Sequence, residues 1–314
     1  MNETRRTLLS AFAAGPATGP ELAAELGVSR AAVWKQVDAL REAGFEIEST
    51  PDGYAVTSVP AYGAAAIEYE LDAPYTVEYH DSIGSTNDRA RELAADGDRD
   101  IVVVADEQTG GRGRLERSWD SPPGGIWASA VLDPSLPAAH VPLVTLAAGV
   151  AVVDACRAVG VEATLKWPND VLVGDDPDSD RGGQKLAGIL TEMEGEADRV
   201  SWLLVGIGLN ANIAREALPD GAASLQEQGG DVDRRAVLQT ILESLSTLVA
   251  APDTIIEQWR AYSSTLGRAV RVDTGREQIE GRAVDVQFPG ALVVDTDSGE
   301  AVVHAGDCEH LRPV

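Results

Sequence analysis

Residues 185–207 read KLAGILTEMEGEADRVSWLLVGI, two apolar runs joined by an acidic connection that contains Gly195. Apolar runs of this length, bounded by turn residues, predict two strands, at residues 185–193 and 200–207. Similar short runs predict further strands at residues 75–80, 101–105, 125–132 and 163–166. Apolar residues at helical spacing predict helices at residues 86–95, 141–158, 234–248 and 254–262. The sequence therefore predicts a mixed α/β (α+β) central domain, which we place at residues 75–265.

The N-terminal segment has a different pattern. Helices are expected at residues 5–13, 21–26 and 30–43, with Gly27 ending the second and Ser29 capping the third. The sequence GFEIESTPDGYAVTS (residues 44–58) then gives two extended runs around a Pro-Asp-Gly turn. This order predicts a winged helix-turn-helix at residues 1–58, and residues 59–74 are expected to be a linker.

The C-terminal segment, residues 266–314, changes to short β runs separated by glycine turns. This pattern predicts a small β-barrel of the SH3-like kind. Within the central domain, the acidic and glycine-containing residues 175–183 are expected to form a mobile loop between two strands.

The net charge of the chain limits the classes of partner that it can bind. Its 314 residues include 51 acidic and 25 basic ones, for a net charge of −26, and only three are lysines. So acidic a surface argues against non-specific binding to nucleic acid or to anionic membranes. Carboxylates in excess with almost no lysine suggest a halophilic protein, which is our hypothesis here. Because lysines are scarce, Lys166 and Lys185, which both lie in dense motifs, are expected to have a function.

The cysteine content and hydropathy indicate a cytoplasmic protein. Two cysteines, Cys156 and Cys308, are too few for a disulfide framework or a zinc site. No apolar run is expected to reach membrane-spanning length, and the N-terminus is too polar for a secretion signal.

The first chemical motif is GGRGR, residues 110–114, preceded by Gln108 and followed by Trp119. Glycines let backbone amides approach a ligand closely, and two arginines supply planar, forked donors for phosphate or carboxylate. The pattern is neither a Walker A loop nor a dinucleotide fingerprint. A flexible turn with exposed arginines is the alternative, and it is less attractive in a chain with so few basic residues.

Two further motifs contain the lysines. In KWPND, residues 166–170, Pro168 ends a strand, and Asn169 and Asp170 supply oxygen atoms suited to Mg²⁺ on nucleotide phosphates. An ordinary Pro-Asn-Asp turn explains the same letters. In KLAGIL, residues 185–190, Lys185 could neutralise a phosphate while Gly188 leaves room for a ligand. The alternative there is an exposed charge at a strand start.

Two polar motifs complete the set. In SIGSTN, residues 82–87, small hydroxyl and amide side chains precede a helix and could hold an amide-like ring, although Ser85 or Thr86 could equally be a helix N-cap. GIGLN, residues 206–210, is a glycine-rich strand end that finishes at Asn210. The four histidines lack metal-binding spacing, and no Ser-His-Asp arrangement can be assembled.

In this order, STN, QxxGRGR, KWPND, KLAGI and GIGLN resemble the motifs of biotin–protein ligases, and the small C-terminal β-domain matches too. The N-terminal unit looks like that of the bifunctional subgroup, the biotin operon repressors. The resemblance covers nearly the whole chain; each motif is weak alone, whereas five in register are specific.

The resemblance implies roles for individual residues. Biotin would be bound by Ser85, Thr86, Asn87, Gln108, Gly111, Arg112, Gly113, Arg114, Lys185 and Gly188. ATP would be bound by Trp119, Lys166, Asn169 and Asn210, with Mg²⁺ at Asn169 and Asp170. Lys185, Arg112 and Arg114 would be catalytic. The family often has glycine where this chain has Glu116, a departure that could alter how the loop orders.

The implied reaction joins biotin and ATP into biotinyl-5′-AMP and then transfers biotin to a lysine of a biotin carboxyl carrier protein. Both reactants are anions, so cations must offset their repulsion. Two alternatives stay open: a biotin-sensing transcription factor with little ligase activity, and a lipoate–protein ligase. The arginines and Lys185 disfavour the first, and the motif set favours biotin over lipoate.

Operator DNA is a further expected partner, through Ser29, Arg30, Lys35 and Gln36 on the predicted recognition helix. Residues 1–58 nevertheless carry five basic against eight acidic residues, whereas a DNA-binding face is normally basic. A winged helix used only for packing or protein contacts is the alternative. The resemblance also suggests a homodimer formed edge to edge through the central sheet.

Overall fold

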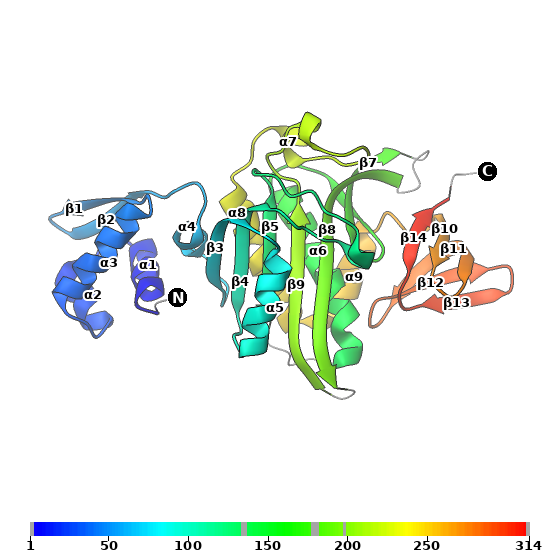
Figure 1. Ribbon diagram of the computed structural model, residues 1–314, viewed down its shortest axis with the longest axis horizontal. Coiled ribbons are helices and arrows are strands. Elements are labelled where there is room, and N and C mark those ends of the chain that lie inside the picture. Colours follow the sequence, from blue (N-terminus) through cyan, green and yellow to red (C-terminus); the bar gives the residue numbers. More distant parts are fainter. Residues whose placement is uncertain (1–2, 133–136, 177–181, 197–198, 312–314) are drawn as a thin grey trace.

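The computed structural model describes residues 3–132, 137–176, 182–196 and 199–311. The chain forms three parts in a row: a small N-terminal unit, a large central domain around a sheet, and a small β-domain at the C-terminus (Figure 1). The fold class expected from the sequence is confirmed by this arrangement.

The N-terminal unit is a winged helix-turn-helix. Its elements are α1 (Glu3–Ala14), α2 (Gly19–Glu25), α3 (Arg30–Glu42), β1 (Glu46–Thr50) and β2 (Gly53–Ser58). Helix α2 begins with a capping box in which Thr18 and Glu21 bond each other's backbone amides, and Ser29 caps α3. Apolar side chains of the three helices and of β1 form a core of their own, so this unit has the contents of an independent domain.

The connection between the N-terminal unit and the central domain is packed. Residues 59–74, expected to be a linker, contain the short helix α4 (Ala64–Glu68). Its Ala65 lies in the core of the N-terminal unit, whereas Ile67 lies in the core of the central domain. The Glu68 carboxylate accepts a hydrogen bond of 2.7 Å from the Val77 amide and lies 3.6 Å from the Arg5 guanidinium. Helix α4 therefore joins the two cores.

The central domain is built on a seven-stranded sheet within the described residues, in the order β3-β4-β5-β9-β8-β7-β6. Its strands are β3 (Thr76–Ile83), β4 (Ile101–Gln108), β5 (Ile126–Leu132), β6 (Ala163–Lys166), β7 (Asp170–Asp176), β8 (Gly182–Glu196) and β9 (Arg199–Leu209). Strands β3 and β4 are parallel and the remaining pairs are antiparallel. Because β8 and β9 are antiparallel, the start of β8 lies beside the end of β9, so the KLAGI and GIGLN motifs are neighbours in the sheet.

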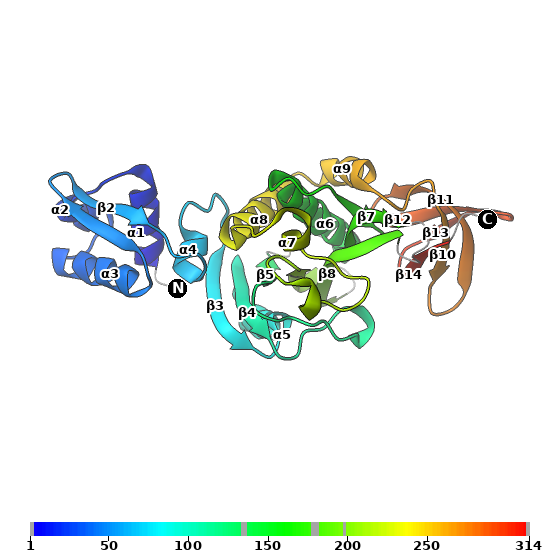
Figure 2. The same ribbon diagram turned by 90° about the horizontal axis from the view of Figure 1, so that it is seen from above.

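Helices cover both faces of the sheet. They are α5 (Thr86–Asp96), α6 (Val141–Ala158), α7 (Leu225–Gly229), α8 (Arg234–Ala250) and α9 (Ile255–Tyr262). Alternate residues of β4 divide between the two faces: Val103 packs with α5, whereas Val102 and Val104 pack with α6. Figure 2 shows α6 and α8 on one side of the sheet and α5 on the other.

Two expectations from the sequence need correction. The predicted bounds of the loop at residues 175–183 are wrong, because β7 continues to Asp176 and pairs there with Gly182 of β8. Residues 177–181 of this predicted loop lie outside the described residues. The expectation that no apolar run reaches membrane-spanning length is also wrong, since residues 138–158 are long and apolar enough. Two thirds of that window is buried, as in the core helix of a globular domain.

The C-terminal part is a five-stranded antiparallel sheet in the order β13-β12-β11-β10-β14. Its strands are β10 (Ala269–Asp273), β11 (Gln278–Gln287), β12 (Ala291–Thr296), β13 (Gly299–Val303) and β14 (Asp307–His310). The Trp167 indole of the central domain is buried and donates a hydrogen bond of 2.9 Å to the Gly290 carbonyl. The small β-domain is thus anchored beside KWPND.

Candidate active site

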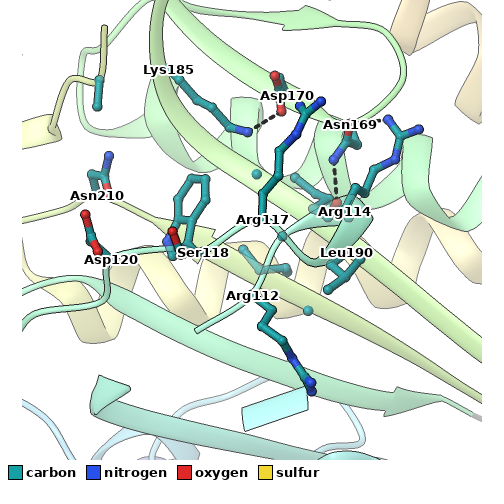
Figure 3. A pocket seen from close by; sticks show the side chains of 18 of the residues that line it. Arg112, Arg114, Arg117, Ser118, Asp120, Asn169, Asp170, Lys185, Leu190 and Asn210 are labelled. Atoms are coloured by element: carbon teal, nitrogen blue, oxygen red, sulfur yellow. Dashed lines mark hydrogen bonds and ion pairs between the residues drawn. The ribbon is translucent and has the colours of Figure 1, made fainter. Parts of the chain in front are cut away.

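A cavity of about 580 Å³ lies between the central sheet and the small β-domain. Several segments that are distant in sequence line it: the start of α5, the loop after β4, the β6–β7 turn with β8 and β9, residues 217–222, and the start of β14. Figure 3 shows labelled side chains of the loop after β4, of the β6–β7 turn and of β8 around this cavity.

The floor of the cavity is made of glycines in β8 and β9. A Cβ placed on Gly188 would lie 3.2 Å from the Trp119 ring, and one on Gly208 would lie 2.9 Å from the Trp119 Nε1. These two strands therefore have no side chains there so that the indole can lie against the sheet. The Trp119 Nε1 is buried and has no hydrogen-bond partner among the described residues, which leaves one donor unpaired beside the sheet.

One wall is a polar cradle whose cavity-lining residues are Ser85, Thr86, Asn87 and Gln108, with Ser129 buried behind them. The Gln108 Oε1 accepts hydrogen bonds from the Thr86 amide at 2.8 Å and from the Thr86 hydroxyl at 3.0 Å. Ser129, fully buried, lies 2.7 Å from the Thr86 hydroxyl and 2.6 Å from the Asn87 Oδ1. The cradle is thus held in place by its own bonds before any ligand arrives.

For Ser85 the helix-cap interpretation of SIGSTN is confirmed, whereas contact with a ligand stays a prediction. Its hydroxyl accepts a bond of 3.4 Å from the Asp88 amide, so it is the N-cap of α5, and the residue also lines the cavity. Helix capping and ligand contact are compatible because a hydroxyl has two acceptor lone pairs and one donor.

Lys185 lies within β8, not at its start, and its ammonium is held from two sides. The Lys185 Nζ lies 2.6 Å from an Asp170 oxygen and 4.9 Å from the centre of the Trp119 ring (Figure 3). The side chain is only 20% exposed, so most of the charge is shielded from water. An anion in the cavity would find this ammonium fixed beside it.

The remaining nucleotide candidates lie along the same side. The Asn169 Oδ1 accepts a hydrogen bond of 3.0 Å from Arg114, while its Nδ2 donates one of 2.8 Å to the Ile189 carbonyl. Lys166 is buried and its ammonium donates to the Cys308 carbonyl of β14. Asn210 is buried and donates 2.9 Å to the Ala223 carbonyl.

The opposite wall is the arginine loop, residues 110–119. Arg112 pairs with Asp88 at the start of α5, and its guanidinium points away from Lys185 (Figure 3). Arg114 and Arg117 instead pair with Asp307 of β14, at 3.6 Å and 2.5 Å. The three arginines share one cavity but are held by carboxylates of different domains.

The tip of the arginine loop has an unusual backbone. Leu115 and Glu116 both have positive φ, 55° and 54°, a conformation that favours glycine. Leu115 is also 71% exposed. The departure at Glu116 noted in the sequence therefore falls at a position where glycine would be less strained.

The structure brings nearly all the predicted site residues together. Those that line the cavity are Ser85, Thr86, Asn87, Gln108, Arg112, Gly113, Arg114, Trp119, Lys166, Asn169, Asp170, Lys185, Gly188 and Asn210. Gly111 is not among its lining residues; a Cβ there would lie 2.4 Å from the Trp119 carbonyl, so its visible role is close packing at the base of the loop. Contact between Gly111 and biotin stays a prediction.

The predicted DNA-binding residues lie on a separate part of the molecule. Ser29, Arg30, Lys35 and Gln36 are all at α3, at the opposite end from the small β-domain (Figure 1). Arg30 and Lys35 are exposed, whereas Gln36 is half-buried. Trp34, which the sequence interpretation missed, is 53% exposed on the same helix.

Other functional candidates were also missed. Ser129 gave no signal because it lies alone in an apolar strand. Arg117 is only three residues beyond the motif and could have been included. Asp307 could be placed only by the fold, since 190 residues separate it from Arg117.

Magnesium fits the donor chemistry of the site in part. Asn169 and Asp170 offer the hard oxygen atoms that Mg²⁺ prefers. No group of three or more His, Cys, Asp or Glu suited to a metal exists among the residues that the structure describes. The pair therefore suits an ion held mainly by nucleotide phosphates and water.

Sequence profiles match all three parts of the chain. The Biotin/lipoate A/B protein ligase family matches residues 79–210, an HTH domain matches residues 4–55, and the Biotin protein ligase C terminal domain matches residues 265–311.

Whole-chain relatives and solved structures agree. The bifunctional ligase/repressor BirA of Bacillus subtilis is 35% identical over 312 residues, covering 93% of both chains. BirA of Escherichia coli is 30% identical over 300 residues, covering 89% of this chain and 88% of that one. Biotin protein ligase from Aquifex aeolicus in complex with biotin and ATP superposes with a TM-score of 0.62 and 29% identity, covering 76% of this chain and 99% of that chain.

Proposed function

This chain belongs to the biotin protein ligase family, in the bifunctional form that carries a helix-turn-helix, and from that premise we propose how its cavity works. The enzyme activates biotin with ATP to form biotinyl-5′-AMP. It then transfers biotin to a lysine of a biotin carboxyl carrier protein. The relatives' names and the biotin and ATP bound to the Aquifex aeolicus structure support this assignment.

The observation that carries the proposal is the placement of Lys185. Its ammonium lies over the Trp119 ring and next to Asp170, above a glycine floor and between a neutral polar wall and a cationic wall. A neutral, hydrogen-bonding cradle suits the ureido ring of biotin, and the cations suit a carboxylate and phosphates.

The residues divide accordingly. The cradle residues Ser85, Thr86, Asn87 and Gln108 hold the ring, and Gly188 leaves room for the rest of biotin. Lys166, Asn169, Asn210 and Trp119 hold the nucleotide. Mg²⁺ bound through ATP would be held at Asn169 and Asp170, where it would supply charge neutralisation on the phosphates.

The chemistry requires no nucleophile from the protein. A biotin carboxylate oxygen attacks the α-phosphorus of ATP, and pyrophosphate leaves with the bonding electron pair. Lys185 offsets the negative charge that builds up between these two anions. The neutral amine of the acceptor lysine then attacks the carbonyl carbon, AMP leaves, and the amine loses its proton. The arginine loop shields the anhydride from water between the two steps.

We further propose that the N-terminal unit binds operator DNA through α3. Ser29 and Arg30 at its start and Lys35, five residues after Arg30, are exposed to solvent, which suits a helix entering the major groove. Footprinting upstream of biotin genes at high KCl, with and without biotin and ATP, tests this half. Absence of any biotin-dependent protection would remove it.

A homodimer through the central sheet is also proposed. In the described register, β7 pairs with β8 only as far as Gly188, whereas β8 continues to Glu196 with β9 as its partner. Residues 190–196 therefore offer a strand edge suited to a second copy. Sedimentation of the chain with and without biotin and ATP tests it.

A cytoplasmic and halophilic setting is proposed from the free buried cysteines and the net charge of −26.

The decisive experiment is biotin-dependent exchange of pyrophosphate into ATP at high salt. It reports the first half-reaction without the acceptor. Exchange with biotin, and its absence with lipoate, is expected. Biotin binding without exchange would instead identify a sensor with little ligase activity.

A further inference from the structure

Strand β14 of the small β-domain contacts the catalytic cavity at successive positions. Just before the strand, the Gly306 carbonyl accepts a hydrogen bond of 2.9 Å from Arg114. The Asp307 carboxylate forms ion pairs with Arg114 and Arg117. The next carbonyl, that of Cys308, accepts from Lys166. One short strand thus holds three of the basic side chains that line the cavity.

The side chain that makes this arrangement possible is Asp307. Its two carboxylate oxygens divide between two arginines, with Arg114 at 3.6 Å from Oδ1 and Arg117 at 2.5 Å from Oδ2. The Asp307 side chain is 29% exposed, which places it at the rim. The carbonyl contacts depend on backbone position alone, so Asp307 is the point at which a substitution can loosen the loop.

The other end of the same loop is held by a different domain. Arg112 pairs with Asp88 of α5, and the backbone between the two attachment points contains the strained residues Leu115 and Glu116. A loop with two consecutive residues in the left-handed region keeps that shape only when its surroundings over-determine it. The two carboxylates, one from each domain, supply that constraint.

We propose that Asp307 is a positioning residue that closes the arginine loop over the cavity from the small β-domain, so that this domain helps to retain the reactive adenylate. The inference rests on the proposed function of the same cavity. Asp307 acts through Arg114 and Arg117: its carboxylate keeps their guanidinium groups at the rim while the loop covers the anhydride.

The test compares Asp307→Asn with Asp285→Asn in the full chain at high salt. Asp285 is a matched control because it also joins the small β-domain to an arginine of the central domain, Arg260 at 2.7 Å, but does not line the cavity. Biotinyl-AMP is formed with radiolabelled biotin, ATP and pyrophosphatase. The complex is then isolated, and release of the adenylate is followed by rapid filtration.

We expect Asp307→Asn to raise the release rate about fivefold, since an exposed ion pair shifts an equilibrium by about twofold to fivefold and two such pairs are lost. The fold-increase in the rate of adenylate release should exceed the fold-change in the rate of pyrophosphate exchange. Asp307→Glu should restore retention to within about twofold of the wild type, and Asp285→Asn should behave as the wild type. Arg117→Ala, a change at a 69% exposed side chain, should raise release in the same direction.

Unchanged release in both Asp307→Asn and Arg117→Ala would overturn the proposal. A raised KM for ATP with normal retention would overturn it too, because Asp307 would then be a nucleotide contact. Failure of the proposed function looks different: the wild-type chain itself would show no biotin-dependent exchange.

Discussion

The two walls of the cavity, the polar cradle and the arginine loop, differ in burial and in the interactions that hold them. The polar cradle is buried, with Thr86 3% exposed and Ser129 not exposed at all, and its polar atoms bond one another. The arginine loop is open to solvent, with the Arg112 side chain 37% and the Arg117 side chain 69% exposed. One wall is shaped before a ligand binds, whereas the other is held by pairs that water and salt weaken.

This difference suggests a division between recognition and retention. A rigid neutral cradle can select a ring by its hydrogen-bonding pattern, because misplaced partners would leave buried polar groups unpaired. A loop held by exposed ion pairs can open and close at a small energetic cost. Substitutions in the cradle should therefore act through steric packing, whereas the effects of substitutions in the loop should depend on ionic strength.

The largest effect is expected where the two walls meet. Lys185→Ala should lower biotin-dependent pyrophosphate exchange by about 100-fold to 1000-fold, the range for removing one preorganised group that stabilises transition-state charge. The measurement is the exchange rate at saturating biotin and ATP. The fold should be kept, because the side chain is at the cavity surface, and thermal unfolding by circular dichroism checks this. Full activity in the variant would show that Lys185 has no catalytic role.

The second prediction tests the rigidity of the cradle. In Gly206→Ala the new Cβ would lie 2.1 Å from the Asn87 Oδ1, a distance that forces Asn87 to move. Because Asn87 is fixed by Ser129 and by Glu192, the cradle cannot adapt without losing those bonds. We expect the KM for biotin to rise about tenfold to a hundredfold, measured by exchange at varied biotin concentrations.

The matched control for that variant lies on the other wall. In Gly113→Ala the nearest atom to the new Cβ, the Arg117 carbonyl, would be 3.7 Å away, an ordinary contact. Gly113 lines the cavity and is itself a predicted biotin contact, but no atom needs to move, so its KM for biotin should rise by less than that of Gly206→Ala. Equal effects of the two substitutions would contradict the distinction between a rigid cradle and an adaptable loop.

Much of this contrast was visible in the sequence, because it follows from residue type. Glycines and arginines together in residues 110–114 predicted a cationic loop, and the small polar residues before α5 predicted a neutral wall. The winged unit, the α/β class and the small β-domain followed from periodicity, capping residues and turns. Strand β7 was missed because its apolar run is only three residues, 171–173, next to a glycine and acidic residues.

What the sequence could not supply were contacts between distant segments. Nothing in AGDCEH, residues 305–310, marks Asp307 as a partner of the arginine loop. The pairing of Lys185 with Asp170 was hidden as well, since it depends on the β7–β8 register, which places Asp170 opposite Gly188. A carboxylate assigned to metal binding thus also holds a lysine.

The third prediction concerns a buried contact that should respond to pH. Burial, together with the positive charges of Lys166 and Arg268, lowers the pKa of His310 from 6.5 to about 3. The folded chain thus keeps His310 neutral while the unfolded chain takes up a proton below pH 6.5. Stability is therefore fully present above that pH and falls as the pH drops from 6.5 toward 3. Between pH 7 and 5 the loss is about 1–2 kcal/mol.

Urea unfolding at constant high salt measures this dependence. His310→Gln removes the titration and can keep the bond to the Thr265 hydroxyl, which is 3.1 Å from His310 Nε2. The variant should lose about 1–2 kcal/mol less than the wild type over the same pH range. His304→Gln, at an exposed histidine of the same domain, is the control and should follow the wild type. Parallel curves for all three proteins would refute the role of His310.

The smallest effect is expected at the exposed pair between the loop and α5. Asp88→Asn removes a carboxylate that Arg112 shares with Arg91 and replaces no residue of the cradle, and release of biotinyl-AMP should rise about twofold to fivefold. The increase should shrink as KCl is raised over the range in which the chain stays folded, because salt already weakens the pair in the wild type. Glu92→Gln, which breaks the Arg89–Glu92 pair on the same helix, should leave release unchanged. An effect of Asp88→Asn that does not vary with salt would mean that Asp88 acts through the buried wall, and the separation of the two walls would fail.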